Sequence, residues 1–183
     1  MNTLQTETER LVIRLLVEED YSSWLSQYEN RYPSQHSYDE GKIDMSICTK
    51  EWFRDLVMKH HQMAEEDKVY VLGVFRKADN SHLGFIDFST IIREEFQWAR
   101  FGYTIHNHFW RKGYAKEAVK AALDLAFGKL NYHRIEAHIN LDNIPSIRLA
   151  ESVGMVYECT RQGFIYENNA WTDHLVYYIN ASQ

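Results

Sequence analysis

One stretch in the middle of the chain constrains its fold most, because a basic, glycine-centred loop, Trp110–Gly113, runs directly into an amphipathic helix. From Ala115 onward, apolar residues recur at the three- and four-residue spacing of a helix that buries one face: Ala118, Val119, Ala122, Leu123 and Ala126. Residues Phe101–Ile105, before the loop, form a predicted strand. The first turn of such a helix has unpaired N–H groups at the positive end of its dipole, and Gly113 carries no side chain that would keep an anion away. Strand, loop and helix together predict a phosphate-binding turn.

The commonest nucleotide-binding signatures are absent, because the chain contains neither G-x-x-x-x-G-K-[ST] nor a G-x-G-x-x-G that follows a strand. The string Gly113-Tyr114-Ala115 instead resembles the G-x-G/A core of the acetyl-CoA pyrophosphate loop of the GNAT N-acetyltransferases. The wider run from Gly102-Tyr103 to Ala118 looks like the Rim-type branch, which acetylates ribosomal-protein N-termini. Trp110 stands where that branch often has a tryptophan.

Two further motifs follow at the spacing of the same family. The segment Asn143–Met155 is similar to N-x-x-S-x-x-x-x-x-x-x-G-[FM], and Glu158 comes just after it. Asn169–Asp173 then leads into the last predicted strand. The resemblance extends from about Arg10 to Ile179. It implies one GNAT domain over residues 1–183, with an α/β (α+β) fold: a mixed, mostly antiparallel, splayed sheet of about seven strands with helices on both faces.

The order of elements agrees with that fold. Strands are predicted at Arg10–Leu15, Val69–Phe75, His82–Ile92, Phe96–Ile105, His133–Asn140 and, approximately, Met155–Phe164 and Ala170–Ile179. Helices are predicted to open at Glu18–Asp20, to run over Lys50–Ala64 and from Tyr114 to near Gly128, and to start again at about Pro145. Residues 31–49 are predicted to form a long loop or helical fragment. Proline and glycine are sparse, and no linker or repeat divides the chain.

The resemblance implies acetyl-CoA as co-substrate and assigns its parts to particular residues. A pantetheine arm can add to a sheet like an extra strand, and the family places it on the backbone of Tyr103, Thr104 and Ile105, which would also polarise the thioester carbonyl. The pyrophosphate falls to the loop and first helical turn: Arg111, Lys112, Gly113, Tyr114, Ala115 and Lys116.

Amide formation also needs a base for the ammonium proton and a proton or hydrogen bond for the leaving thiolate. The resemblance implies that Glu158 is the base and that Ser146 lies near the sulfur and assists the thiolate. Asn143 would bind the pantetheine or the thioester end. If Glu158 is not the base, Glu136 and Asp173 are the next candidates.

Each of these assignments has a structural alternative. Asn143 and Ser146 are also typical capping residues for the short helix at Pro145. Glu158 can be a solvated strand residue. Cys159 beside it would suit a covalent acyl intermediate, but neighbouring strand residues point to opposite faces, which favours a packing role.

The chain departs from many GNAT enzymes at one position. They carry a tyrosine four residues before the glycine of the second motif, where it protonates the thiolate, and this chain has Ala150 there. The departure leaves Ser146 or water as the proton source. Rim-type enzymes often lack the same tyrosine.

Charge and composition exclude several other functions. The formal net charge of −6 argues against a nucleic-acid partner, because phosphate backbones select basic surfaces. The apolar run Leu11–Val17 contains Arg14 and is too short to span a membrane. Two cysteines make no disulfide framework, so we expect a cytoplasmic protein. No histidine spacing assembles a metal site, so we expect no metal; the histidines in question are His106, His108, His133, His138 and His174.

We therefore expect an acetyl-CoA-dependent N-acetyltransferase, a monomer or homodimer, that acts on a primary amine. The acceptor is either a protein or peptide N-terminal α-amine or a small-molecule amine such as an antibiotic or metabolite. A non-catalytic acyl-CoA-binding module is the alternative. Residues 31–49 and the closing hairpin should form the acceptor walls. Within them, Tyr32, Tyr38, Asp39 and Asp44 form either an acidic and aromatic pocket or plain surface.

Overall fold

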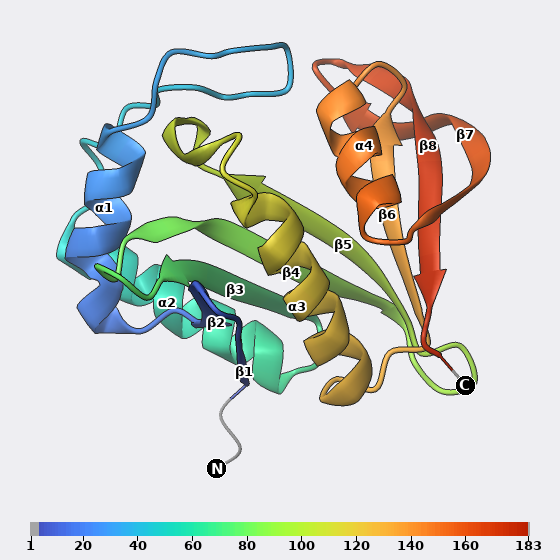
Figure 1. The fold of residues 1–183 in the computed structure, drawn as a ribbon, viewed down its shortest axis with the longest axis horizontal. Coiled ribbons are helices and arrows are strands. Elements are labelled where there is room, and N and C mark those ends of the chain that lie inside the picture. Colours follow the sequence, from blue (N-terminus) through green and yellow to red (C-terminus); the bar gives the residue numbers. More distant parts are fainter. Residues whose placement is uncertain (1–3, 183) are drawn as a thin grey trace.

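An open, eight-stranded sheet runs through the computed structural model, which describes residues 4–182 (Figure 1). Its spatial order is β1-β2-β3-β4-β5-β6-β8-β7. The strands are β1 (Gln5–Glu7), β2 (Leu11–Leu15), β3 (Val69–Arg76), β4 (His82–Ile92), β5 (Trp98–Ile105), β6 (Arg134–Asn140), β7 (Val156–Glu167) and β8 (Ala170–Asn180). Neighbouring strands are antiparallel except for β5 and β6, which are parallel. The predicted mixed, mostly antiparallel sheet is confirmed, and the short edge strand β1 is an addition that the sequence pattern did not predict.

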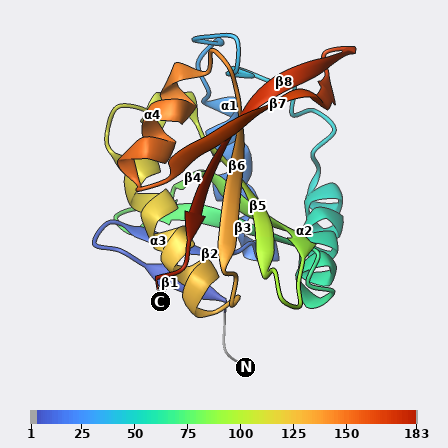
Figure 2. The ribbon, with the colours of Figure 1, turned by 90° about the vertical axis from the view of Figure 1, so that its right-hand side faces the viewer.

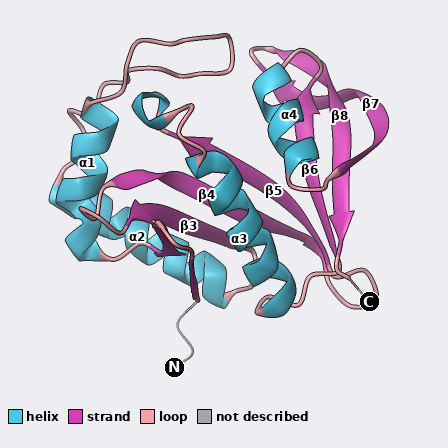
Figure 3. Ribbon diagram, in the orientation of Figure 1, coloured by secondary structure: helices cyan, strands magenta, loops and turns pink. Residues whose placement is uncertain are grey.

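Helices cover both faces of the sheet, as predicted (Figures 2 and 3). The elements are α1 (Tyr21–Glu29), α2 (Lys50–Glu65), α3 (Tyr114–Gly128) and α4 (Ile144–Ser152), with short 3-10 turns η1 (Glu18–Asp20) and η2 (Asn107–Phe109). Helices α3 and α4 lie on one face, and α1 and α2 lie on the other. No helix among residues 4–182 is both long and apolar enough to cross a membrane.

The core lies mainly between α3 and the sheet. The predicted apolar stripe of α3 is buried there, and its members are Ala118, Val119, Ala122, Leu123 and Ala126. A second, smaller cluster packs α1 and α2 on the opposite face, around Trp24, Phe53 and Phe75. Because α3 is the crossover connection between parallel strands β5 and β6, its packing sets where these two strands lie.

The parallel strands β5 and β6 pair over only part of their length. The register joins Trp98–Phe101 to Arg134–Ala137 and ends there. Beyond this point the strands diverge, as the wedge between β5 and the β6–β8–β7 group shows in Figure 1. Tyr103, Thr104 and Ile105 therefore have a strand partner in β4 but none on their β6 side. This is the predicted splay of the sheet, and it creates an unpaired strand edge.

Residues 31–49 form the predicted long loop between α1 and α2. Polar contacts hold its first part, because Arg31 Nη2 lies 3.0 Å from Asp39 Oδ1 in a buried ion pair. The Asn107 side chain accepts a 2.7 Å hydrogen bond from the Tyr32 N–H and donates one of 3.0 Å to Asp39 Oδ2. The loop is thus tied to η2, close to the end of β5.

Candidate active site

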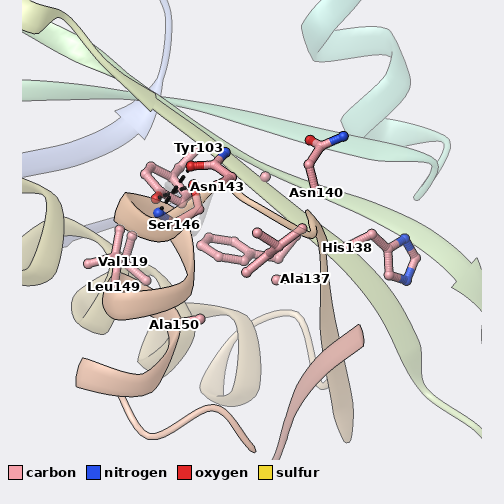
Figure 4. A pocket seen from close by; sticks show the side chains of 12 residues that line it. Tyr103, Val119, Ala137, His138, Asn140, Asn143, Ser146, Leu149 and Ala150 are labelled. Carbon is pink, nitrogen blue, oxygen red and sulfur yellow. Dashed lines mark hydrogen bonds between the residues drawn. The ribbon is translucent and has the colours of Figure 1, made fainter. Parts of the chain in front are cut away.

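A cavity of about 150 Å³ opens where β5 and β6 diverge (Figure 4). Its lining comes from β5, α3, β6 and α4: Phe101, Gly102, Tyr103, Val119, Ala137, His138, Ile139, Asn140, Asn143, Ser146, Leu149 and Ala150. Three predicted site residues, Tyr103, Asn143 and Ser146, therefore come together in one place. They lie on the side of the cavity nearest α4.

The Tyr103 side chain reaches across the cavity to α4. Its hydroxyl donates a hydrogen bond of 3.1 Å to Ser146 Oγ. Burial raises the pKa of the Tyr103 phenol, and the bond to Ser146 only partly opposes this effect. A phenol and a serine hydroxyl are therefore hydrogen-bonded to each other on the cavity wall.

Sequence reasoning gave Tyr103 only a backbone role and missed its side chain. The signal was present in the alternation of the strand, because Phe101, Tyr103 and Ile105 share the face that packs toward α3. Ala150, which replaces the tyrosine of many family members, lines the same cavity and is buried. The cavity is therefore lined by the phenol of Tyr103 from β5, although α4 has an alanine at the position where many family members have a tyrosine.

Asn143 caps α4, as the structural alternative predicted. Its Oδ1 accepts a 3.3 Å hydrogen bond from the Ser146 N–H, and Pro145 lies in the first turn of the helix. The cap also places both residues on the cavity wall. Capping and cavity lining are therefore compatible at this helix N-terminus.

The start of α3 leaves its first backbone N–H groups open. Gly113 is the N-cap residue in a left-handed conformation, with φ of +79°, and no side chain caps the helix. Arg10 fixes the loop to the helix. Its Nη1 donates a 3.1 Å hydrogen bond to the Lys112 carbonyl, and its Nη2 lies 2.6 Å from Glu117 Oε2 in an ion pair. The side chains of Arg111 and Lys112 are exposed. An exposed, basic helix N-terminus of this kind attracts anions.

Trp110 fixes the end of β5 close to this loop. Its indole N–H donates a 2.6 Å hydrogen bond to the Ile105 carbonyl, and its ring stacks on His36 at 5.3 Å. The tryptophan that marked the Rim-type resemblance therefore has a structural position between the unpaired edge of β5 and the glycine loop.

Glu158 does not line the cavity. It lies on β7, its side chain is 39% exposed, and its Oε2 accepts a 2.6 Å hydrogen bond from Arg134. Its role as the base stays a prediction. Cys159 is a partly buried free thiol on the same strand. Within residues 4–182, no group of three or more His, Cys, Asp or Glu side chains is arranged to hold a metal ion.

The predicted acidic and aromatic pocket does not form as one unit. Asp39 is buried against Arg31, while Tyr32 is largely exposed. Asp44 is also exposed, and its Oδ1 accepts a 2.9 Å hydrogen bond from the Ser46 N–H. Tyr38 instead donates a short hydrogen bond to Asp142, in the turn between β6 and α4. The expectation of a shared pocket was wrong because buried Asp39 is needed to order the loop itself.

Comparison with known proteins agrees with this geometry. A family model described as an acetyltransferase (GNAT) domain matches residues 10–156. The probable N-acetyltransferase YjcK of Bacillus subtilis (strain 168) is 33% identical over 128 residues, which cover 70% of this chain and 71% of that protein. The ribosomal protein uS5-alanine N-acetyltransferase of Escherichia coli (strain K12) is 26% identical over 175 residues, which cover 92% of this chain and 87% of that enzyme.

The fold is also similar to that of a solved structure, Mycobacterium smegmatis RimJ in complex with CoA-disulfide. The TM-score is 0.76 at 20% sequence identity, over 93% of this chain and 82% of that one. The resemblance to Rim-type enzymes is therefore confirmed in both sequence relatives and fold.

Proposed function

Because this chain belongs to the GNAT acetyltransferase family and is an acetyltransferase, we propose that it transfers the acetyl group of acetyl-CoA directly to a primary amine in the cavity between β5 and β6. One observation carries the proposal: the unpaired edge of β5 connects the open N-terminus of α3 to the Tyr103–Ser146 pair. These features match the three parts of acetyl-CoA, which are an anionic end, an amide-bearing arm and a thioester.

The pyrophosphate would bind at Gly113–Lys116, where backbone N–H groups and the helix dipole favour negative charge. Arg111 and Lys112 would add side-chain charge. The pantetheine arm would then follow the free edge of Tyr103–Ile105, since its amides can pair with a strand edge as another strand does. Along β5 the backbone groups of Thr104 face β4, and the Ile105 carbonyl already accepts the bond from Trp110. The open backbone groups are therefore the N–H and carbonyl of Tyr103 and the N–H of Ile105.

The thioester would then lie beside Ser146. The amine nitrogen attacks the carbonyl carbon, and the resulting oxyanion needs a backbone N–H from the free edge of β5. When the C–S bond breaks, the thiolate takes a proton from Ser146, Tyr103 replaces it through their hydrogen bond, and Tyr103 regains a proton from solvent. An ammonium acceptor and acetyl-CoA thus give an amide, free CoA thiol and one proton released to solvent.

We favour the α-amine of a protein or peptide N-terminus as acceptor. The support is a relative, the enzyme named for the alanine of ribosomal protein uS5, which matches over nearly the whole chain. Two carboxylates near the C-terminal end of β6 would also attract a cationic amine. Glu167 accepts a hydrogen bond from Asn140, the last residue of β6, and Asp142 accepts one from Tyr38 of the 31–49 loop. A small-molecule amine is the second candidate acceptor for the same site.

The test is a measurement of CoA thiol release with a panel of amines: peptides with different first residues, polyamines and aminoglycosides. N-acetylated versions of the active peptides are the matched control and should give no release. Binding is measured separately by thermal shift, since acetyl-CoA at a hundredfold excess over its dissociation constant should stabilise the fold by roughly 2.7 kcal/mol. A thermal shift without thiol release from any amine would favour the non-catalytic acyl-CoA-binding module. No shift with any acyl-CoA would reject both.

A further inference from the structure

A histidine and a buried glutamate form a pair on β6, at the edge of the cavity. His138 lines the cavity, and its Nε2 lies 2.9 Å from Glu136 Oε2. The two side chains are 5% and 1% exposed. In Figure 4, His138 extends from β6 away from the Tyr103–Ser146 pair, toward the other face of the sheet. The hydroxyl groups of Tyr103 and Ser146 thus lie on the α4 side of the cavity, and the imidazole of His138 lies on the opposite face of β6.

The surroundings of Glu136 keep its carboxylate ionised. Burial alone would raise the pKa of this carboxyl, but hydrogen bonds from His138 and Arg134 and the charges of Arg134 and Arg161 hold it below its usual value. Arg134 Nη2 lies 2.8 Å from Oε1, and Arg161 Nη2 lies 3.4 Å from Oε2. Glu158 pairs with Arg134, so two carboxylates balance two guanidinium groups before His138 is counted.

The same contacts determine which nitrogen of His138 is free. A carboxylate accepts hydrogen bonds and cannot donate them, so Nε2 must carry the proton that points to Glu136. In the neutral imidazole, Nδ1 then holds the lone pair, and it has no hydrogen-bond partner among residues 4–182. The rings of Phe164 and His138 pack nearly perpendicular to each other, at 83°, with their centroids 5.0 Å apart. Phe164 lies in the irregular stretch of β7 between Arg161 and Ile165, where the pairing register shifts.

We infer that His138 is the general base of the transfer reaction and that Glu136 is its positioning residue. The inference rests on the proposed function. CoA would enter on the face that carries α3 and α4, so the amine must reach the thioester from the other side, where His138 lies. His138 Nδ1 takes a proton from the ammonium group and releases it to solvent. It then takes the second proton from the nitrogen of the tetrahedral intermediate as the C–S bond breaks and releases it to solvent, from which the Tyr103–Ser146 pair regains the proton that it gave to the thiolate.

The test compares variants of His138 in the full chain with the wild type, using an amine that the wild type acetylates. His138→Gln is the sharpest variant, because its amide N–H can replace Nε2–H toward Glu136 while it provides no base at Nδ1. We expect kcat to fall by roughly 10²–10⁴-fold, while the dissociation constant of acetyl-CoA and the melting temperature stay near wild-type values. His133→Gln is the matched control, because His133 is exposed just before β6.

Two further variants separate a catalytic from a structural role. His138→Ala leaves space for a small molecule, so added imidazole should restore part of its turnover, which a packing defect would not allow. Glu136→Gln should lower kcat less than His138→Gln and leave the KM for acetyl-CoA unchanged. Near-normal turnover of both His138 variants would overturn the inference, and so would a loss confined to Glu158→Gln. Absence of thiol release by the wild type with every amine would instead refute the proposed function, and this inference with it.

Discussion

The Tyr103 hydroxyl donates a hydrogen bond to Ser146 Oγ across the point where β5 and β6 separate. The bond joins the strand that would carry pantetheine to the helix that would face the sulfur. It also supplies a phenol on the cavity wall where Ala150 leaves α4 without one. In the proposed mechanism, proton delivery to the thiolate depends on a strand residue and a helix residue together.

Tyr103→Phe should lower kcat by about 10²-fold, the low end of what a positioned proton donor contributes, because the ring still fills its place but supplies no proton. Ser146→Ala should cost less, since water can replace a hydroxyl group. The double variant should be no worse than Tyr103→Phe, because the two residues act in one chain. Steady-state kinetics with calorimetric titration of acetyl-CoA checks this, and strictly additive losses would mean that the residues act separately.

Gly113→Asp should weaken acetyl-CoA binding at least tenfold, about 1.4 kcal/mol, because a carboxylate would meet the pyrophosphate. Gly113→Ala should weaken it less, through the strain of a side chain at a φ of +79°. Gly128→Ala is the matched control at the other end of α3, where an added Cβ meets no atom within 4 Å. Calorimetry measures the affinities. Unchanged affinity of a folded Gly113→Asp variant would exclude this loop as the pyrophosphate site.

Trp110→Phe should keep the stacking on His36 but lose the hydrogen bond to the Ile105 carbonyl. We expect a loss of about 1 kcal/mol in the free energy of unfolding, or roughly 2–4 °C in melting temperature. Acetyl-CoA affinity should fall as well, because the end of β5 is no longer fixed. Trp171→Phe, at a 65% exposed position, is the control and should change neither quantity. Equal behaviour of the two variants would contradict this account of Trp110.

The free energy of unfolding should decrease as the pH falls below about 6.5. His82 and His106 are buried, with His82 Nδ1 3.2 Å from His106 Nε2, and burial lowers their pKa values to about 3 and about 2. Between those values and 6.5, the unfolded chain binds protons that the folded chain does not, so acid favours unfolding. Each histidine should contribute up to about 1.4 kcal/mol per pH unit.

Urea unfolding at pH 7, 6 and 5 measures this dependence. His82→Gln should reduce the slope by up to one proton, because glutamine does not titrate, whereas the exposed control His133→Gln should leave it unchanged. A His82→Gln slope equal to that of the wild type would show that His82 does not remain neutral in the fold.

The parts that were predicted well are those that short-range patterns encode. Helix α3 has its predicted extent because an apolar stripe of helical period lies between Gly113 and Gly128. The Asn143 cap is likewise a local contact, three residues from Ser146. The mixed, mostly antiparallel and splayed sheet followed from the family resemblance. The edge strand β1 was missed because three residues are too few to show a period.

The parts that were missed depend on contacts between distant residues. Tyr103 and Ser146 are 43 positions apart, and Tyr38 and Asp142 are 104 apart. Alternation along β6 puts Glu136 and His138 on the face opposite Ile135, Ala137 and Ile139, but this pattern does not reveal that Glu136 is buried. That burial comes from Arg134 and Arg161, which neutralise the carboxylate as the C-terminal hairpin packs beside β6.

The sequence by itself determined which segments form helices and strands, the glycine loop at the start of α3 and the family, because residues close together in the chain specify each of them. Only the tertiary structure decided which polar side chains share the cavity. It placed Glu158 in an ion pair with Arg134, outside the cavity, and it brought Tyr103 and Ser146 together on the cavity wall. The physical reason is that alternation along one strand gives the face on which a side chain lies but not the residue that it meets on another element, because that partner depends on how α3, α4 and the β7–β8 hairpin pack around β5 and β6.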